Sequence, residues 1–479
     1  EMLRSLVGSE MCIRDRLGDV VQSGATSGSP RSIVAQTHSD FIHSVAERVR
    51  WRTDDATAAM FERCFENTLG TTLREMPDGT LFMLTGDIPA MWLRDSTAQL
   101  GPYLHFAAED QTISDMIAAV SRRQIEYVLL DPYANAFNAA PDGSGHQSDR
   151  TQQSPWIWER KYEVDSLCYP VQLAHDLWAT TGRADHLGDS FARAARVIIE
   201  LWRTEQDHEA HSTYRFERLD CPPSDTLVRE GRGSETAPTG LTWSAFRPSD
   251  DACEYGYNVP GNMFAAVELQ HIESIAIEVL HDEDLAASAR DLRADIERGI
   301  AEHTVVTSPS GDDIYAYEVD GRGGILLLDD ANVPSLLSLP LIGWCGTDDP
   351  LYLATRRFIL STANPVFFTG TLASGTDSSG LGSPHTPVDH VWPIGLCIEA
   401  LTTDDRAEKE RILRLLLETD AGTGLMHESF LVTDPSVFTR EWFSWANAMF
   451  CELVLDMTGL ATPRREPVRR EPLTEARPA

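Results

Sequence analysis

The sequence is poor in positive charge. Only 40 of its 479 residues are lysine or arginine, against 74 aspartates and glutamates, which gives a formal net charge of −34. A surface this acidic repels phosphate backbones and anionic lipid head groups, so we expect neither nucleic acid nor a membrane among its partners. A neutral substrate meets no such barrier.

Long hydrophobic runs are also missing. A membrane-spanning helix needs about 18 or more predominantly apolar residues in a row. The most apolar stretch, residues 324–345, is interrupted by Asp329, Asp330, Pro334 and Pro340. The hydrophobic share of 42% and the charged share of 24% are ordinary for globular proteins and exclude wholesale disorder. The sequence therefore predicts a folded, non-membrane chain.

Paired cysteines are absent as well. None of the eight cysteines forms a C-x-x-C pair, and a disulfide framework is typical of short secreted chains. We therefore expect buried, reduced thiols and a cytoplasmic protein. His208 and His211 lack a plausible third ligand, and His385 and His390 lie in a glycine-rich loop, so the sequence predicts neither a metal nor a cofactor. Signatures of dinucleotide, nucleotide-phosphate, zinc-protease and serine-hydrolase sites are missing too.

What the sequence does contain is helical periodicity. No strand–helix–strand alternation is visible, which argues against a parallel α/β sheet. Two short hairpins are expected at residues 73–84 and 314–328, around glycine-containing turns. Apolar residues recur at helical spacing in twelve segments: 40–50, 56–69, 97–108, 113–130, 166–181, 187–202, 260–280, 285–303, 351–360, 391–401, 406–417 and 443–457.

About twelve helices without a dividing linker predict an all-α fold, an (α/α)6 barrel with small β-hairpin excursions, over residues 33–460. Long loops at 131–161, 221–257 and 365–390 would converge on one end of such a barrel and build a cleft. Residues 1–32 are expected to be disordered or non-native sequence, and residues 461–479, rich in proline, arginine and glutamate, a disordered tail.

Residues 86–96 lead into one predicted helix and carry Trp92, Arg94 and Asp95. An arginine beside a carboxylate offers fixed donors and acceptors for the vicinal hydroxyls of a sugar, so these three are candidate substrate contacts. The alternative is a plain helix start, in which Asp95 or Ser96 caps the helix and Arg94 pairs with a nearby carboxylate.

Residues 243–257 place the adjacent Asp250 and Asp251 among aromatic residues. Apolar surroundings and a neighbouring like charge both raise a carboxyl pKa, which suits a general acid. From spacing alone, however, a capping or turn role is favoured for both.

Glu428 lies beside a histidine after a glycine-rich turn. This arrangement fits a general base holding a water molecule, although an ordinary glutamate in the first turn of a helix fits as well. Residues 370–393 are interpreted either as a flexible lid, with His385 as a substrate contact, or as a solvated Gly/Ser loop.

Four motifs that follow one another along the chain are more specific than any one alone. They are GDIPAMWLRDSTAQ (86–99), YEVDSLCYP (162–170), FRPSDDA (246–252) and LMHESF (425–430). Together they closely resemble the metal-independent exo-α-1,6-mannosidases of glycoside hydrolase family 125. The likeness runs from about Phe41 to Gly459, with Ala245 standing where glycine is expected.

The resemblance implies an (α/α)6 barrel that releases terminal α-1,6-linked mannose from mannose-terminated oligosaccharides with inversion. It places the general acid at Asp250, with Asp251 as the close alternative, the general base at Glu428, and substrate contacts at Arg94 and Asp95. An inverting enzyme holds its two carboxyls roughly 6.5–9.5 Å apart, and a closed ring would bring them face to face. Two other hypotheses stay open: a glucoamylase- or trehalase-like hydrolase, and a non-catalytic glycan-binding protein.

Overall fold

The computed structural model describes residues 39–462. The predicted segment 1–32 lies outside the described residues, and so does nearly all of the predicted tail 461–479. The longer helices are α3 (Ser39–Arg50), α4 (Asp55–Thr71), α7 (Gln111–Leu130), α8 (Val164–Thr181), α9 (Asp189–Glu205), α12 (Val259–Ile275), α13 (Glu283–His303), α14 (Pro350–Ile359), α15 (Pro393–Leu401), α16 (Arg406–Glu418) and α17 (Ser444–Thr458). The shorter ones are α5 (Leu93–Ala98), α6 (Gly101–Leu104), α10 (His208–His211), η1 (Pro223–Asp225), α11 (Val228–Gly231) and the π-turn η2 (Ala276–Leu280).

Within residues 39–462 the strands form small antiparallel sheets of two or three strands. Three of these sheets, β3-β4-β5, β10-β9-β6 and β13-β14-β15, combine strands from distant parts of the chain. The strands are β1 (Leu73–Glu75), β2 (Leu81–Met83), β3 (Met91–Trp92), β4 (Ala136–Phe137), β5 (Ile157–Glu159), β6 (Tyr257–Asn258), β7 (Val305–Thr307), β8 (Asp313–Tyr315), β9 (Glu318–Val319), β10 (Ile325–Leu326), β11 (Phe367–Thr371), β12 (Asp377–Leu381), β13 (His390–Val391), β14 (Ser429–Leu431) and β15 (Asp434–Thr439).

Burial separates the helices into an inner and an outer set. Helix α12 is buried on nearly every face, from Val259 through Leu269 to Ile275, which is the pattern of a helix enclosed on all sides. Helix α9 instead buries residues at a spacing of three and four, such as Phe191, Ala195 and Ile198, and turns charged residues outward. A stripe of this kind belongs to a helix that packs on one side only.

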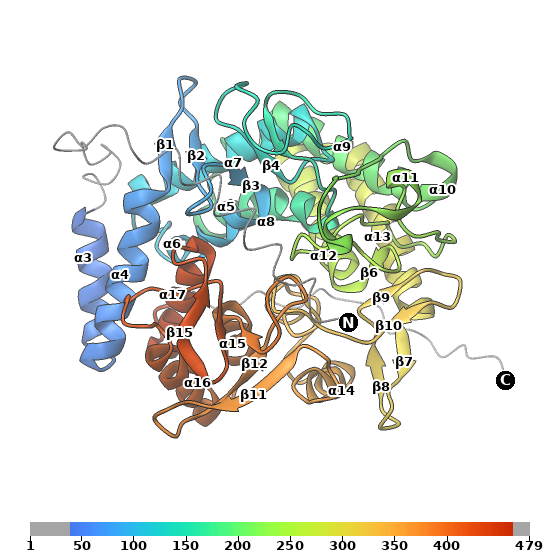
Figure 1. The fold of residues 1–479 in the computed structure, drawn as a ribbon. Helices are drawn as coiled ribbons and strands as arrows, with labels where there is room; N and C mark the ends of the chain where they lie inside the picture. Colours follow the sequence, from blue (N-terminus) through green and yellow to red (C-terminus); the bar gives the residue numbers. More distant parts are fainter. Residues whose placement is uncertain (1–38, 463–479) are drawn as a thin grey trace.

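The inner helices form a closed ring. Helix α5 packs on α8, α8 on α12, α15 on α17, and α17 back on α5. Between α12 and α15 the ring is completed by residues 331–343, a run of bends and turns in which Gly343 lies against Val267 of α12 and Ala331 against Gly395 of α15. Outside them, α7 packs on α8, α13 on α12, α16 on α15 and α4 on α17. Figure 1 shows α3 and α4 beside α17, so the two ends of the described chain meet.

This ring of paired helices is the predicted (α/α)6 architecture, and most predicted helices agree with the observed ones within a few residues. The prediction of a single helix over residues 97–108 was wrong. Helix α5 ends at Ala98 and α6 begins at Gly101, with Pro102 in its first turn. Since proline has no backbone N–H, it cannot extend the hydrogen-bond ladder of the preceding helix.

The strand predictions were right in one place and partly wrong in another. Strands β1 and β2 form the hairpin expected at 73–84. In the second region only β9 and β10 form a hairpin around the predicted glycine turn, whereas Ile314 belongs to β8, which pairs with β7. Residues 370–393, expected as a flexible lid or a solvated loop, begin instead with a hairpin. Strands β11 and β12 pair there, and Gly382 packs so closely on the ring of Phe368 that a side chain would not fit.

The sequence also led us to expect buried, reduced cysteines and no membrane-spanning helix. Between residues 39 and 462, Cys64, Cys168, Cys253, Cys397 and Cys451 are buried free thiols, Cys221 is a partly exposed one, and Cys345 is buried. Among the described helices, none combines the length and the hydropathy needed to cross a bilayer.

Candidate active site

One end of the ring carries a pocket built by the segments that enter the inner helices. It encloses ≈ 410 Å³, counting its open mouth. Its aromatic walls are Trp92, Trp392, Phe443 and Trp445, and its charged residues are Arg94, Asp95, Asp250, His385, Glu428 and Arg440. Six of the seven residues proposed from the sequence therefore line one cavity; the seventh, Asp251, does not.

The residues that precede the inner helices explain why side chains gather here. Trp92, Glu163, Trp392 and Phe443 are the N-cap residues of α5, α8, α15 and α17, and none of their side chains caps its helix. Serine, threonine, aspartate or asparagine would normally stand there and bond the first backbone N–H groups. These positions instead direct large or charged side chains to the end of the ring, so the plain helix-start interpretation of Asp95 or Ser96 does not hold.

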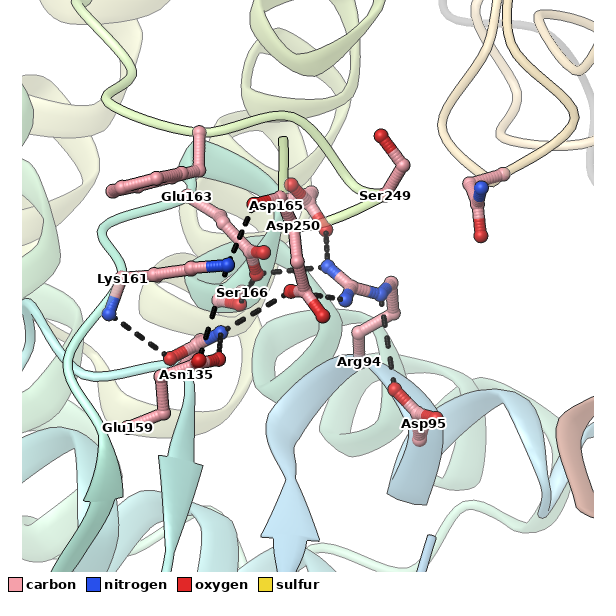
Figure 2. A network of polar contacts seen from close by, with 12 residues as sticks. Arg94, Asp95, Asn135, Glu159, Lys161, Glu163, Asp165, Ser166, Ser249 and Asp250 are labelled. Carbon is pink, nitrogen blue, oxygen red and sulfur yellow. Dashed lines mark hydrogen bonds and ion pairs between the residues drawn. The ribbon is translucent and has the colours of Figure 1, made fainter. Parts of the chain in front are cut away.

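Arg94 organises the floor of the site. Its Nη1 donates to Glu163 Oε2 at 2.8 Å and to Asp165 Oδ2 at 3.0 Å, and its Nη2 donates to Asp250 Oδ1 at 3.4 Å. Asp95 lies on its Nε side at 3.7 Å. Figure 2 shows the guanidinium between these four carboxyls, and its side chain is only 3% exposed.

Asp250 lies at the edge of this cluster and reaches the cavity. Its backbone has φ 67°, a left-handed conformation that aspartate tolerates better than most residues. Asn135 donates to its carboxyl at 3.4 Å, and Lys161 Nζ donates to its carbonyl oxygen at 2.8 Å. Burial raises the pKa of Asp250, but the positive charges of Lys161 and Arg94 outweigh burial, and the net pKa is lowered.

Asp251 turns away from the cavity. It is 3% exposed, accepts a hydrogen bond from Ser249 Oγ at 3.3 Å, and its Oδ1 lies 3.5 Å from Nδ1 of His385. Burial lowers the pKa of His385, but the hydrogen bond to Asp251 and the charges of Asp251, Glu428 and Asp250 raise it to about 9. His385 is therefore an imidazolium at neutral pH, held by Asp251 at the pocket wall.

Glu428 lies across the pocket, directly before β14. Its side chain is 9% exposed, and Arg440 Nη1 donates to its Oε1 at 3.4 Å. The same guanidinium is held by Asp87, with Nε 3.1 Å from Oδ1, and stacks 4.5 Å over the ring of Phe443. Arg440 thus holds Glu428 in place. Glu428 is not a helix-start residue, which removes the alternative interpretation.

Asp95 differs from the other carboxyls of the site. Burial raises the pKa of Asp95 to about 6, against the opposing charges of Arg94 and Arg440. A carboxyl of this kind exchanges between proton donor and acceptor near neutral pH, which suits a contact with sugar hydroxyls.

Comparison with known proteins decides the class. A model of the family described as metal-independent alpha-mannosidase (GH125) matches residues 54–455. The chain belongs to this family. It is a glycoside hydrolase, and the resemblance seen in its four motifs is confirmed.

Relatives of the mannosidase support the same assignment. A Streptococcus pneumoniae metal-independent alpha mannosidase, solved in a non-productive complex with alpha-1,6-mannobiose, is 50% identical, with a TM-score of 0.84 and coverage of 88% of this chain and 97% of the other. The Meiotically up-regulated gene 157 protein of Schizosaccharomyces pombe is 38% identical, covering 88% of this chain and 86% of its own length. A bacterial glucoamylase bound to acarbose, 12% identical with a TM-score of 0.54, covers 84% of this chain and 56% of the glucoamylase, and shares the barrel fold.

Sequence reasoning missed three charged residues of this site. Glu163 and Asp165 stand only inside the motif at 162–170, and Arg440 lies in none of the predicted site segments. Glu163 and Asp165 lie at the start of a helix with aromatic residues nearby, and this position was the sequence signal that could have identified them as site residues. Arg440, which directly follows β15, left no recognisable pattern. In the part of the chain that the structure describes, no group of three or more His, Cys, Asp or Glu side chains is placed to hold a metal ion.

Replacing the central arginine should destabilise the mannosidase strongly. Arg94→Met would leave the buried Glu163 and Asp165 without their cation, so we expect the free energy of unfolding to fall by about 3–5 kcal/mol. Burial already raises the pKa of both carboxyls, and losing Arg94 raises them further. The native variant then binds more protons than its unfolded state, so its stability should fall as pH rises from 5 to 8.

Urea unfolding at several pH values checks this expectation. Arg406→Met is the matched control, because Arg406 is 77% exposed and forms an ion pair with Glu410 on the surface of α16; an exposed pair of this kind contributes roughly 0–1 kcal/mol. Equal stability of the two variants would contradict the role assigned to Arg94.

Proposed function

We propose that the chain is an inverting, exo-acting α-1,6-mannosidase that removes terminal mannose from mannose-terminated oligosaccharides, such as fragments of N-glycans or mannans. The observation that carries the proposal is that Asp250 and Glu428, far apart in the sequence, line the same pocket. The likeness to a relative solved with α-1,6-mannobiose supports the linkage.

The two carboxyls take complementary roles. Asp250, the more accessible of the adjacent aspartates with a side chain 25% exposed, gives a proton to the glycosidic oxygen as the bond to the leaving sugar breaks. Glu428 accepts a proton from a water molecule that attacks the anomeric carbon from the opposite face. Arg440 holds Glu428 in position for this task. Attack from the opposite face inverts the configuration, so β-mannose is the first product.

The remaining pocket residues bind the sugar. Trp92, Trp392 and Trp445 offer flat apolar faces to the C–H side of a hexose. Asp95 and the His385 imidazolium offer an acceptor and a donor for its hydroxyls, and Asp251 acts through His385. The floor formed by Arg94 and Trp445, whose side chains are both buried, limits the pocket to a chain end, in keeping with exo action.

Proton NMR of α-1,6-mannobiose hydrolysis tests the proposal. We expect the β-anomer signal of free mannose to rise first and the α-anomer to follow by mutarotation, at a rate that EDTA does not change. Isomaltose and trehalose, the substrates of the competing barrel hydrolases, should release no glucose. Tight binding of mannobiose without release of mannose would instead identify a glycan-binding protein, and initial α-mannose would exclude inversion.

A further inference from the structure

The proposed acid has a difficulty that the structure itself raises. A general acid must carry a proton before the reaction. Asp250, however, lies beside the guanidinium of Arg94 and the ammonium group of Lys161, and both stabilise its ionised form. The proton that Asp250 delivers therefore has to be held elsewhere.

The cluster around Arg94 holds more carboxyls than charge to match them. Four carboxyls surround this single guanidinium, and those of Asp95, Glu163 and Asp165 are each no more than 6% exposed. Lys161 does not redress the balance, because it is already paired with Asp225 and lies 3.9 Å from Glu159. Four ionised carboxyls around one cation, shielded from water, would repel one another strongly, and one of them takes up a proton instead.

Glu163 is the member of the cluster whose bonding requires that proton. Its side chain is fully buried, and its Oε2 accepts hydrogen bonds from Arg94 and, at 2.6 Å, from Ser166. Its Oε1 is buried, and no N–H or O–H group within residues 39–462 donates to it. A carboxylate oxygen left in this state is costly, whereas a protonated carboxyl could supply an O–H to the carboxylate of Asp250, which accepts from the same Arg94 guanidinium.

We propose that Glu163 stores the proton that Asp250 delivers to the leaving oxygen. The proposal rests on the proposed function and deepens it. When the glycosidic oxygen begins to accept a proton, the O–H of Asp250 breaks; Asp250 has received that proton from Glu163, whose own O–H breaks as the Asp250 O–H forms. Glu163 is then a carboxylate paired with Arg94, and a proton from solvent restores the pair after the product leaves. Glu163 is thus a positioning residue that acts through Asp250.

The surrounding charges favour this distribution of the proton. Glu163 faces Arg94, Asp165 and Asp250; Asp250 in turn faces Lys161, Arg94, His385, Glu159 and Asp95. Burial raises the pKa of Glu163 well above its usual value, Arg94 lowers it, and the neighbouring Asp250 raises it again. The pair Glu163–Asp250 therefore keeps one shared proton at neutral pH, chiefly on Glu163.

Glu163→Gln tests the proposal with little change of shape. The glutamine carbonyl can accept from Arg94 and Ser166, and its amide can donate to Asp250, but it has no proton to pass on. With α-1,6-mannobiose at pH 7 we expect kcat to fall on the order of 100-fold and KM to stay within a few-fold. The basic limb of the pH profile should move to lower pH, because Asp250 alone, beside two cations, loses its proton earlier.

A second substrate separates proton supply from damage to the site. The leaving group of 2,4-dinitrophenyl α-mannoside departs without protonation, so Glu163→Gln should hydrolyse it at nearly the wild-type rate. Glu163→Asp, which keeps a carboxyl, should restore part of the activity on mannobiose. Glu268→Gln is the matched control, because Glu268 is equally buried in α12 but pairs with His271 and lies outside the pocket lining.

Two results would overturn the role of Glu163: equal losses on both substrates, or an unchanged pH profile with mannobiose. Failure of the proposed function itself looks different. It would show as wild-type hydrolysis of mannobiose by Asp250→Asn, or as no hydrolysis of either substrate by the unmodified protein.

Discussion

Glu428→Gln is expected to lower kcat for α-1,6-mannobiose on the order of 10⁴-fold while the protein folds normally. Glutamine keeps the size of the side chain, and its carbonyl can still accept the hydrogen bond that Arg440 now gives to Glu428. It cannot accept a proton from water, so the attacking nucleophile is lost. Because water must attack whatever the leaving group, the loss should be as large for 2,4-dinitrophenyl α-mannoside.

Steady-state rates on both substrates measure this, with thermal unfolding to confirm the fold. Glu441→Gln is the matched control, because Glu441 is exposed and adjacent to Arg440, and the substitution keeps its backbone oxygen, which lies 3.2 Å from Nδ1 of His427. Azide provides a further check, since an external nucleophile can replace the activated water in a variant that lacks its base. A Glu428→Gln protein that keeps a tenth of wild-type activity would remove Glu428 from the mechanism.

Asp250→Asn should have a different signature. We expect kcat for α-1,6-mannobiose to fall on the order of 10³-fold, because the leaving sugar departs as a poor leaving group unless its oxygen is protonated. On 2,4-dinitrophenyl α-mannoside the loss should stay within about 10-fold. Asparagine can keep the bonds from Arg94 and Asn135 to its side-chain oxygen, so a large loss of stability is not expected.

Asp251→Asn tests which of the two adjacent aspartates is the acid, a choice that the sequence left open. Asp251 holds His385 and does not line the pocket, so its amide should mainly raise KM by weakening the imidazolium contact with the sugar. The basic form of His385 should also appear at lower pH, because the hydrogen bond to Asp251 contributes to its raised pKa. If Asp251→Asn instead shows the selective loss expected of Asp250→Asn, the two aspartates exchange roles.

One pair of substrates can therefore distinguish the roles proposed for Glu163, Asp250 and Glu428. Loss on both substrates marks the base, loss on mannobiose alone marks the acid, and loss on mannobiose together with a shifted basic limb marks the store of its proton. The three responses depend on the chemistry of each group rather than on how strongly each variant is destabilised.

The sequence by itself determined the barrel and the general location of the chemistry. Apolar spacing in α9 and α13 records on which side each helix packs, because a one-sided helix needs one apolar stripe. The mixture of aromatic and charged residues at 86–96 made Trp92, Arg94 and Asp95 candidate contacts, because a helix start needs only a cap. Asp250 and Glu428 were assigned as acid and base only through the four motifs that resemble the family.

Only the tertiary structure decided how those residues are arranged. Asp250 and Asp251 are equivalent in the sequence, and only the left-handed backbone at Asp250 turns one toward the cavity and the other toward His385. Glu163 and Arg440 became visible only when the ring closed, since their partners come from distant segments. Helix periodicity is a local property that the sequence carries in its spacing, whereas a carboxyl's protonation depends on which buried charges the fold places around it.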